Sequence, residues 1–351
     1  MNSLAQHWWK ILGVLILIYV LIRGFMTPLH SGILEFSPSQ AYSDTSFTID
    51  IKAYNTHFNE QENRVWLRLP NDSLLKARQT QVQSPVNITA DFDIPGDIDF
   101  EGKKSIVASI IVDNKEDGYA LYPDGVRIKR DTISARGLQA DRYPLSVLYQ
   151  SDKFAFPFRN IIYETIRNTF FHVAIWFAMF ALMIYSCFCS LMYLRTKDFD
   201  YDMKSKSLTT IGIWFGIAGI LTGSMWAKYT WGTFWTADVK LNMSAVAILI
   251  YFAYWVLRAS IPDVDNRARI ASVYNIFAFG SLMVLVMVVP RLTDSLHPGN
   301  GGNPAFGGED LDNTLRTVFY PAIIAYTLIG LWMSQLFYRY LKLENKWLLE
   351  E

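Results

Sequence analysis

The segment that organises this chain is rich in tryptophan and lies between two long apolar runs: Gly223-Ser-Met-Trp-Ala-Lys-Tyr-Thr-Trp-Gly-Thr-Phe-Trp-Thr-Ala-Asp-Val-Lys240. A single tryptophan beside an apolar run is typical of the aromatic belt at a membrane surface, because the indole is apolar but donates one hydrogen bond. Here Trp231, Trp235 and Asp238 fall within eight residues, with Trp226 just before them. That density favours a shelf for a flat, mostly apolar ligand, with a plain aromatic belt as the alternative.

Composition separates the chain into a polar part and an apolar part. Of its 351 residues 51% are hydrophobic, and 32 Lys+Arg balance 32 Asp+Glu. A nucleic-acid partner would require a basic face, which this balance does not provide. Charged residues concentrate in 35–160, whereas most of the remainder is apolar, which predicts one polar domain and one membrane domain. Cys187 and Cys189 lie in an apolar run and are expected to be buried thiols without a disulfide.

The apolar part contains six candidate membrane spans, each close to the ~20 residues that a helix needs to cross a bilayer. They are 8–25, 169–194, 208–226, 239–257, 271–290 and 318–338. The first has no small-x-small cleavage site after it and is expected to be an uncleaved signal anchor. The pairs Gly212-x-x-x-Gly216 and Gly219-x-x-x-Gly223 let helix backbones approach closely, so the third span is expected to be central in the bundle.

Orientation follows from the short basic segments. The loops predicted at 195–206 and 258–270 and the C-terminal tail are rich in Lys and Arg, which places them on the cytoplasmic side. Both termini are then cytoplasmic. The tryptophan-rich segment and the long segment between the first two spans lie on the outer side.

The outer segment reads as β structure. Polar and apolar residues alternate in four runs, at 46–54, 64–69, 105–112 and 125–129. The turn sequences Pro70-Asn-Asp, Pro95-Gly and Pro123-Asp-Gly separate them, which predicts a small antiparallel sandwich. The predicted domains are therefore an N-terminal segment with the first span (1–32), a β-rich domain (33–152), and a five-helix membrane domain (153–351) with a tryptophan-rich loop at 224–240.

Histidines are few, and two of them fall on the same membrane face as the tryptophans. The five are His7, His30, His57, His172 and His297. His172 begins the second span at its outer end, and His297 follows the fifth span on the same side. Two neutral imidazoles beside an aromatic shelf suit a haem, whose iron takes axial ligands, whereas structural zinc usually takes four ligands. The alternative for each histidine alone is an interfacial hydrogen-bonding residue.

Cations near these residues could pair with haem propionates. The candidates are Lys228, Lys240, Arg291 and Arg167, with ordinary interfacial charges as the alternative. His297 precedes Pro298 and a glycine-rich segment at 299–308, which is either a lid over the ligand or a loose loop.

Together these residues resemble the haem-handling CcmC family of c-type cytochrome maturation, over 1–30 loosely and about 155–345 well. Trp226-Ala-Lys and Trp231-Gly-Thr-Phe-Trp-Thr-Ala-Asp238 resemble its "WWD" loop, which lies between the third and fourth of six spans. Phe171-His-Val173 and Leu296-His-Pro-Gly299 resemble its two histidine motifs. Three features depart from the pattern. Ala237 stands where the family has a tryptophan, Ala174 where a proline usually follows His-Val, and the β-rich domain has no counterpart.

The resemblance implies a protein without enzymatic activity of its own. It would hold haem b at the outer face of the bacterial inner membrane and deliver it to the periplasmic haem chaperone CcmE, together with CcmD and the CcmA/CcmB transporter. It also implies the residues of the site. His172 and His297 would be the axial ligands of the iron, and the cofactor-binding residues would be Trp226, Lys228, Trp231, Gly232, Trp235, Asp238 and Lys240.

Two other functions remain open from the sequence. The first is a cytochrome c haem lyase of the CcsA or CcmF kind, which shares the tryptophan-rich loop but resembles a larger protein with histidines inside its spans. The second is a scaffold or transporter subunit without a cofactor, in which every candidate residue is interfacial.

Overall fold

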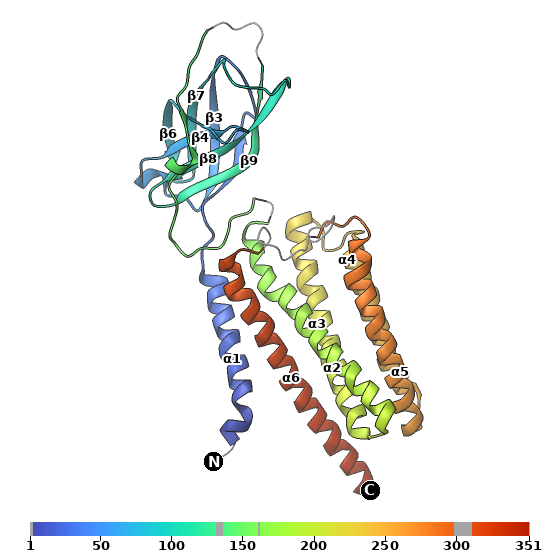
Figure 1. Ribbon diagram of the computed structural model, residues 1–351. Helices are drawn as coiled ribbons and strands as arrows, with labels where there is room; N and C mark the ends of the chain where they lie inside the picture. The colour runs from blue at the N-terminus through green and yellow to red at the C-terminus, as the bar shows by residue number, and fades with distance from the viewer. Residues whose placement is uncertain (1–2, 131–135, 161, 298–310, 351) are drawn as a thin grey trace. The chain divides into compact units, whose positions relative to one another are not determined.

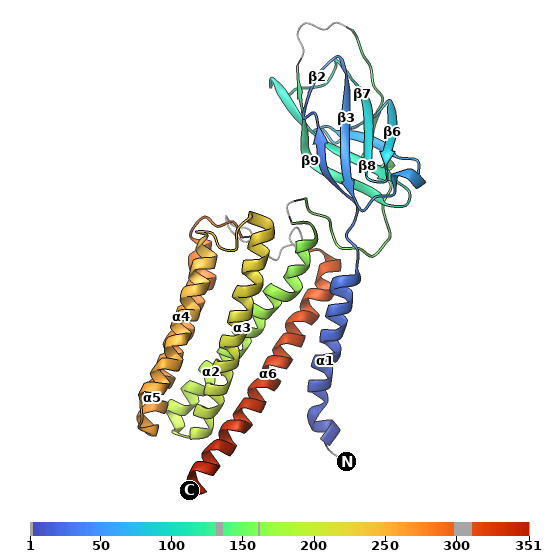
Figure 2. The same cartoon turned by 180° about the vertical axis from the view of Figure 1, so that it is seen from behind.

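The computed structural model describes residues 3–130, 136–160, 162–297 and 311–350 (Figures 1 and 2). The chain divides into two compact units. A helical unit comprises Met1–Thr27 and Glu164–Glu351, and a β-rich unit comprises Pro28–Tyr163. The prediction of a six-helix membrane protein with a β-rich insertion between its first two helices is confirmed.

Six helices of the helical unit are long and apolar enough to cross a membrane. They are α1 (Ser3–Met26), α2 (Ala174–Thr196), α3 (Phe199–Trp231), α4 (Val239–Ser260), α5 (Val264–Met283) and α6 (Asn313–Glu350). Short irregular turns extend two of them. The 3-10 turn Tyr163–Arg167 and the π-turn Thr169–Val173 precede α2, and the π-turn Val284–Val288 and the 3-10 turn Val289–Arg291 follow α5.

Two of the predicted loops, 195–206 and 258–270, are much shorter in the structure. The helix α3 starts at Phe199, so most of 195–206 is helical; Lys197 ends α2 in the left-handed conformation, and the Asp198 side chain accepts from the Asp200 N–H at the start of α3. Likewise, only 261–263 separates α4 from α5. Hydropathy detects the residues inside the bilayer, whereas helical hydrogen bonding continues until a capping residue ends it.

Small residues allow α3 to pack closely against its neighbours. The helix α2 packs against α3, α5 and α6, and α1 packs against α6 (Figures 1 and 2). A Cβ on Gly212 or Gly219 would approach an α2 side chain to 2.7 Å, and one on Gly223 would approach His172, in the π-turn before α2, to 2.6 Å. On Gly216 it would approach Ile248 of α4 to 2.3 Å. The small-residue pairs therefore do what the sequence predicts, because they bring α3 against both α2 and α4.

A buried polar cluster joins three helices inside the bundle. The amide of Asn275 in α5 donates to the hydroxyls of Ser186 and Ser190 in α2, both at 2.9 Å, and of Ser205 in α3 at 3.2 Å. Its carbonyl oxygen accepts from the Thr209 hydroxyl at 3.3 Å. All five side chains are buried. Hydrogen bonds that cross between helices in an apolar surrounding favour one alignment, so the cluster helps to fix how the three helices pack.

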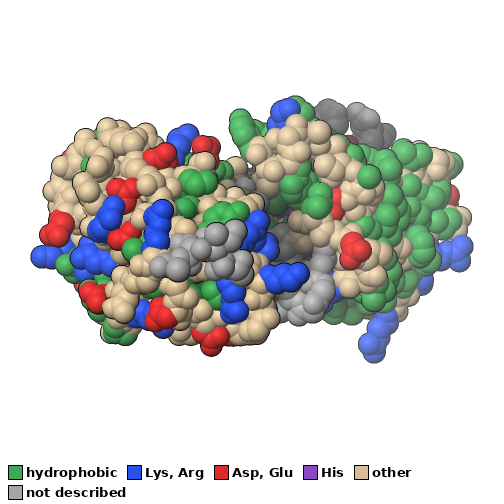
Figure 3. All heavy atoms as spheres, turned by 90° about the horizontal axis from the view of Figure 1, so that it is seen from above, with side chains coloured by type: hydrophobic (Ala, Val, Ile, Leu, Met, Phe, Trp, Pro, Cys, Tyr) green, Lys and Arg blue, Asp and Glu red, His purple; other side chains and the backbone are tan. Residues whose placement is uncertain are grey.

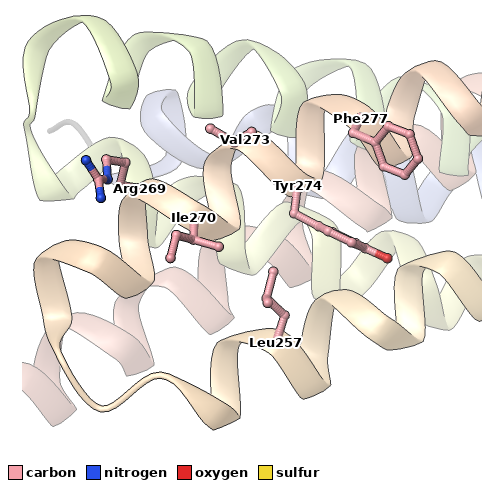
Figure 4. A pocket seen from close by; sticks show the side chains of 6 residues that line it. All are labelled: Leu257, Arg269, Ile270, Val273, Tyr274 and Phe277. Atoms are coloured by element: carbon pink, nitrogen blue, oxygen red, sulfur yellow. The ribbon is translucent and has the colours of Figure 1, made fainter.

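The lipid-facing surface of the helices is apolar. Figure 3 shows hydrophobic side chains gathered over the helices, and large exposed examples are Trp214, Leu221, Leu249, Val256 and Phe277. A shallow groove of about 600 Å³ runs between α4 and α5 (Figure 4). In Figure 4, Arg269 lies at one end of the lining residues and Phe277 at the other. Leu257 places this groove at the opposite end of α4 from the tryptophan-rich segment.

The β-rich unit is a pair of sheets. One has the order β1-β3-β7-β6 and the other β10-β5-β4-β8-β9-β2; every pair is antiparallel except β2 with β9. The strands are β1 (Gly32–Ser37), β2 (Gln40–Tyr42), β3 (Thr45–Tyr54), β4 (Arg64–Arg68), β5 (Leu74–Lys76), β6 (Gln79–Ser84), β7 (Asn87–Ile94), β8 (Ser105–Asn114), β9 (Gly118–Lys129) and β10 (Arg142–Tyr143).

The alternation of polar and apolar residues predicted the strands well, but the prediction of one turn was wrong. The side chains of β3 and β7 alternate between buried and accessible, because each strand turns one face to the core. The sequence Pro123-Asp-Gly lies inside β9 and does not connect two strands. Near it the register with β8 shifts between Ala108 and Ile110, and Asp124 has a positive φ of 51°. Turn-forming residues occur in a β-bulge as well as in a hairpin, so composition alone could not separate the two.

The chain enters and leaves the β-rich unit at one end. Leu29 and Phe156 form a parallel bridge. The His30 N–H donates to the Phe156 carbonyl, and the Phe156 N–H donates to the Pro28 carbonyl, both at 2.8 Å. The two connections to the helices therefore run side by side within this unit.

Candidate functional site

The first candidate ligand, His172, is held in one tautomer by α3. It lies in the π-turn before α2, a kind of helix irregularity that is frequent at functional sites. Its Nδ1 is 2.9 Å from the Gly219 carbonyl oxygen and 3.2 Å from the Thr222 hydroxyl. Since a carbonyl only accepts, the proton resides on Nδ1 and the lone pair on Nε2. Gly223 leaves room for the ring, because a Cβ there would lie 2.6 Å from its Cε1.

Asp238 connects the start of α4 to the segment after α5. It is the N-cap of α4, and its Oδ1 accepts from the N–H groups of Lys240 at 2.9 Å and Leu241 at 3.4 Å. Its Oδ2 accepts from the Ser295 hydroxyl and the Leu296 N–H, both at 2.7 Å. One carboxylate thus accepts hydrogen bonds from two N–H groups that have no partner within the helix, and it also fixes the backbone next to the second histidine.

The second candidate ligand, His297, points its Nδ1 at this carboxylate. The Nδ1 is 3.0 Å from Asp238 Oδ1, and the side chains are only 13% and 1% exposed. Burial and the charge of Lys240 lower the pKa of His297 to about 4, against the opposing effect of Asp238. Burial favours a higher pKa for Asp238, but hydrogen bonds from Ser295 and Leu296 outweigh it and hold that pKa below its usual value. At neutral pH the pair is a carboxylate and a neutral imidazole, whose Nε2 carries the lone pair.

Two of the three tryptophans enclose His297. The ring centroid of Trp231 is 4.9 Å from that of His297, at an interplanar angle of 78°, and Trp226 is 5.9 Å away at 39°. The two indoles contact each other edge to face at 5.0 Å. Trp235 is different, because it is 43% exposed and its Nε1 donates to Asn242 Oδ1 at 3.1 Å.

The tryptophan-rich segment is only partly a loop, which corrects the prediction of a loop at 224–240. The helix α3 continues through Trp231, so Trp226, Lys228 and Trp231 lie on its last turns. Gly232 then ends the helix with φ 81°, and its N–H donates to the Lys228 carbonyl at 3.1 Å. A glycine is preferred at this position because the left-handed conformation has no steric cost without a Cβ. The loop proper is 232–238.

Among the candidate cations, Lys240 lies near both candidate histidines. It is close enough to interact electrostatically with both candidate histidines, with Asp238 and with Arg291. The ammonium of Lys228 instead donates to the Gly232 carbonyl at 2.9 Å and lies over the Phe234 ring.

Arg167 does not join this group. Its guanidinium donates to the carbonyls of Gly24 and Thr27, both at 2.7 Å, and also binds Glu164. It therefore fixes the end of α1, and the expectation that it pairs with a propionate is not supported.

Several residues of the site escaped the sequence analysis. Thr222 and the Gly219 carbonyl orient His172, and Ser295 anchors the segment before His297. Their residue types are common at helix ends and in loops, so nothing in the sequence distinguishes them. The glycine-rich segment at 299–308, interpreted as a lid or a loose loop, lies outside the described residues.

The donor set fits a haem better than a free metal ion. Within the described residues, no group of three or more His, Cys, Asp or Glu side chains could hold a metal ion. A haem iron already has four nitrogen ligands and needs only axial ones. Each of the two candidate imidazoles has Nδ1 hydrogen-bonded, and indoles supply flat apolar contacts.

Comparison with known proteins identifies the family of the helical unit. The family model described as "CcmC: Heme exporter protein C" matches residues 156–347. "Heme exporter protein C" of Bradyrhizobium diazoefficiens is 28% identical over 166 residues, which are 47% of this chain and 62% of the relative. A "Putative cytochrome c biosynthesis ccmC-like mitochondrial protein" of Marchantia polymorpha is 33% identical over 89 residues, 25% of this chain and 39% of the relative.

A further relative, "Heme exporter protein C" of Paracoccus denitrificans, is 23% identical over 169 residues, 48% of this chain and 69% of the relative. The chain thus spans less than two thirds of the length of the first two relatives. The matched segment contains α2 to α5, α6 up to residue 347, both candidate histidines and the tryptophan-rich segment. This chain, a six-helix membrane protein with a β-rich insertion, therefore belongs to the CcmC family of heme exporter proteins.

Proposed function

We propose that this protein binds haem b through His172 and His297, at the periplasmic face of the inner membrane, and delivers it to the haem chaperone CcmE. The observation that carries the proposal is that both imidazoles have the same hydrogen-bonding arrangement. Each has its Nδ1 hydrogen-bonded to an acceptor, Gly219 in one case and Asp238 in the other. Each therefore directs the basic Nε2 away from that acceptor and can bind iron without losing a proton.

The remaining residues have separate tasks in this proposal. Trp226 and Trp231 pack beside His297 and offer flat apolar contacts, while the exposed Trp235 provides an outer edge for the ring. Lys240, with Arg291 nearby, pairs with the propionates. The haem supplies the chemistry of covalent capture, whereas the protein contributes orientation and exclusion of water.

Membrane sidedness supports the same reading. With six spans that alternate in direction, we expect the segments between α1 and α2, between α3 and α4, and between α5 and α6 on one side of the membrane. The histidines and tryptophans belong to these segments or to the adjoining helix ends. Lys and Arg on the opposite side favour a cytoplasmic location for both termini. CcmD and the CcmA/CcmB transporter are the further partners that we propose from the family.

Transfer of haem tests this function directly. The detergent-purified protein, loaded with haem, is mixed with purified CcmE, and haem that survives denaturing electrophoresis on CcmE is measured by its peroxidase activity. We expect transfer from the parent protein and at least tenfold less from the double variant His172→Ala/His297→Ala. Equal transfer from the two proteins would contradict the proposal, and transfer to a cytochrome c apoprotein without CcmE would favour a lyase.

A further inference from the structure

The β-rich unit holds a second histidine in the same arrangement as His297. His57 lies between β3 and the 3-10 turn Phe58–Glu60. Its Nδ1 is 2.8 Å from Asp117 Oδ1, and its backbone N–H donates to Asp117 Oδ2 at 2.9 Å. The carboxylate side chain is 5% exposed, whereas the imidazole is 46% exposed. A buried acid thus presents an accessible imidazole in one orientation.

A network of buried amides supports this acid. Asn114, which is 1% exposed, donates to Asp117 Oδ2 at 2.9 Å and to Asn63 Oδ1 at 3.1 Å. Asn63 in turn donates to the carbonyls of Phe58, the first residue of the 3-10 turn, and Gln61, the residue after it, at 2.8 and 2.9 Å. Burial favours a higher pKa for Asp117, but the hydrogen bonds from Asn114 and His57 outweigh it, so the pKa lies below its usual value. The acid is therefore ionised at neutral pH.

The tautomer of His57 follows from these contacts. An ionised carboxylate only accepts, so the Nδ1 carries a proton, and in the neutral form of the ring the Nε2 carries the lone pair. In the part of the chain that the structure describes, Nε2 makes no hydrogen bond. Only a carboxylate–imidazole pair is present here, and no cluster of three metal-binding side chains occurs among the described residues. A ligand that brings most of its own coordination, as a haem iron does, suits a single imidazole better than a free divalent ion.

Aromatic side chains lie at the same end of this unit. Tyr54, the last residue of β3, pairs in register with Gly32 and stacks on Phe158 at 5.5 Å between centroids. Phe158 also meets Tyr163 edge to face at 5.8 Å. The Ser31 hydroxyl reaches the Asp117 carbonyl at 3.4 Å, which ties the His57 network to the strand that enters the unit. Since Ser31 precedes Gly32, these rings lie near the segment that contacts the His57 network, and they pack on one another.

We propose that His57 is an additional axial ligand for haem iron in the β-rich unit, with Asp117 as its positioning residue. This inference rests on the proposed haem-handling function. It gives the β-rich unit a part in accepting or passing on haem, beyond the two histidines of the helical unit.

The test uses the full-length protein in detergent, in the background His172→Ala/His297→Ala. Ferric haem is titrated and the Soret band followed. We expect this background to retain one haem with the absorption of imidazole ligation, and the further change His57→Ala to weaken its affinity at least tenfold. Asp117→Asn should weaken it by about 10- to 100-fold, as the loss of an orienting carboxylate does. His30→Ala, which removes another histidine of the same unit, is the matched control and should leave the affinity unchanged.

A second measurement avoids variants that fail to fold. In the unmutated protein, modification of His57 by diethyl pyrocarbonate is followed by mass spectrometry, with ferric haem or with metal-free protoporphyrin IX. Protection by haem alone is the expected result, since only the iron can occupy Nε2. Equal protection by both porphyrins, or an unchanged haem affinity in His57→Ala, would overturn the inference. Neither result bears on the role of His172 and His297, because the titrated background lacks both and the modification is read at His57 alone.

Discussion

At the scale of single residues, Asp238 combines two roles that a conservative substitution separates. In Asp238→Asn the side-chain oxygen can still cap α4, because asparagine is as good an N-cap as aspartate. The new amide, however, would face the Ser295 hydroxyl and the Leu296 N–H, which both donate to Asp238. We expect unchanged helix content by circular dichroism and a haem affinity lower by about 10- to 100-fold.

Asp263→Asn is the matched control for this substitution. Asp263 caps α5 by accepting from the Asn266 N–H at 2.8 Å. The variant Asp263→Asn should keep the haem affinity of the parent protein. A similar loss in both variants would show that the effect comes from helix capping and not from His297.

Room for His172 is a second property set by one residue. In Gly223→Ala the new methyl group would lie 2.6 Å from the imidazole Cε1, so the ring must move. We expect at least a tenfold loss of haem affinity, measured by titration in detergent. Gly280→Ala is the control, since a Cβ at Gly280 in α5 meets nothing within 4 Å. Retained affinity in Gly223→Ala would exclude His172 as a ligand in the orientation described.

The buried state of His297 gives the haem-free protein a pH-dependent stability. Its pKa is about 4 when folded, against 6.5 for an ordinary histidine. Between these values the unfolded chain binds the extra proton, so stability is complete above about pH 6.5 and is lost as the pH falls toward 4. The loss amounts to about 3 kcal/mol. Thermal unfolding in detergent should show this loss as the pH is lowered, and His297→Gln should make the stability depend less steeply on pH. An equally steep dependence in His297→Gln would contradict the low pKa of His297.

At the scale of elements, the sequence predicts what lies inside each span and misses what ends it. Apolar runs identified all six helices, and the glycine pairs identified the close approach of α3 to α2. The ends depend on single contacts, such as the left-handed Gly232 and the cap at Asp238. For that reason the sequence predicts that the third span ends at Trp226, whereas α3 continues to Trp231.

The residue types of the candidate site could be predicted from the sequence, but the contacts between these residues could not. Both histidines and the tryptophans followed from their positions beside apolar runs. The contact between Asp238 and His297 joins residues 59 positions apart, and it depends on where α5 delivers the chain. No local pattern in a single sequence contains that information.

Alignment of the helices depends on the polar cluster around Asn275. Asn275→Leu would leave the hydroxyls of Ser186, Ser190 and Ser205 without this partner. Hydrogen bonds between membrane helices contribute on average about 0.6 kcal/mol each, so we expect a loss of roughly 1–3 kcal/mol with a lower thermal midpoint in detergent. Thr196→Ala is the control, because its exposed hydroxyl makes only local bonds: it donates to the Met192 carbonyl and accepts from the Asp198 N–H. Equal midpoints for the two variants would refute the role of the cluster.

At the scale of the whole molecule, the β-rich unit has its own core and should be separable. Its two connections meet in the bridge between Leu29 and Phe156. Replacing residues 31–154 by a short glycine–serine linker should therefore leave the helical unit folded. We expect haem to remain bound through His172 and His297, with weaker contact to CcmE in a pull-down. Loss of haem from the folded helical unit would contradict the expectation that the helical unit binds haem by itself and that the β-rich unit contributes to the contact with CcmE.

The central claim is that His172 and His297 bind haem iron, and the absorption spectrum tests it most directly. The detergent-purified protein from haem-replete cells is compared with His172→Ala and His297→Ala. We predict a Soret band with six-coordinate, low-spin features in the parent protein, and a reduced or altered band in each variant. An unchanged spectrum in both variants would place the ligands elsewhere, and a parent protein without haem would contradict the claim.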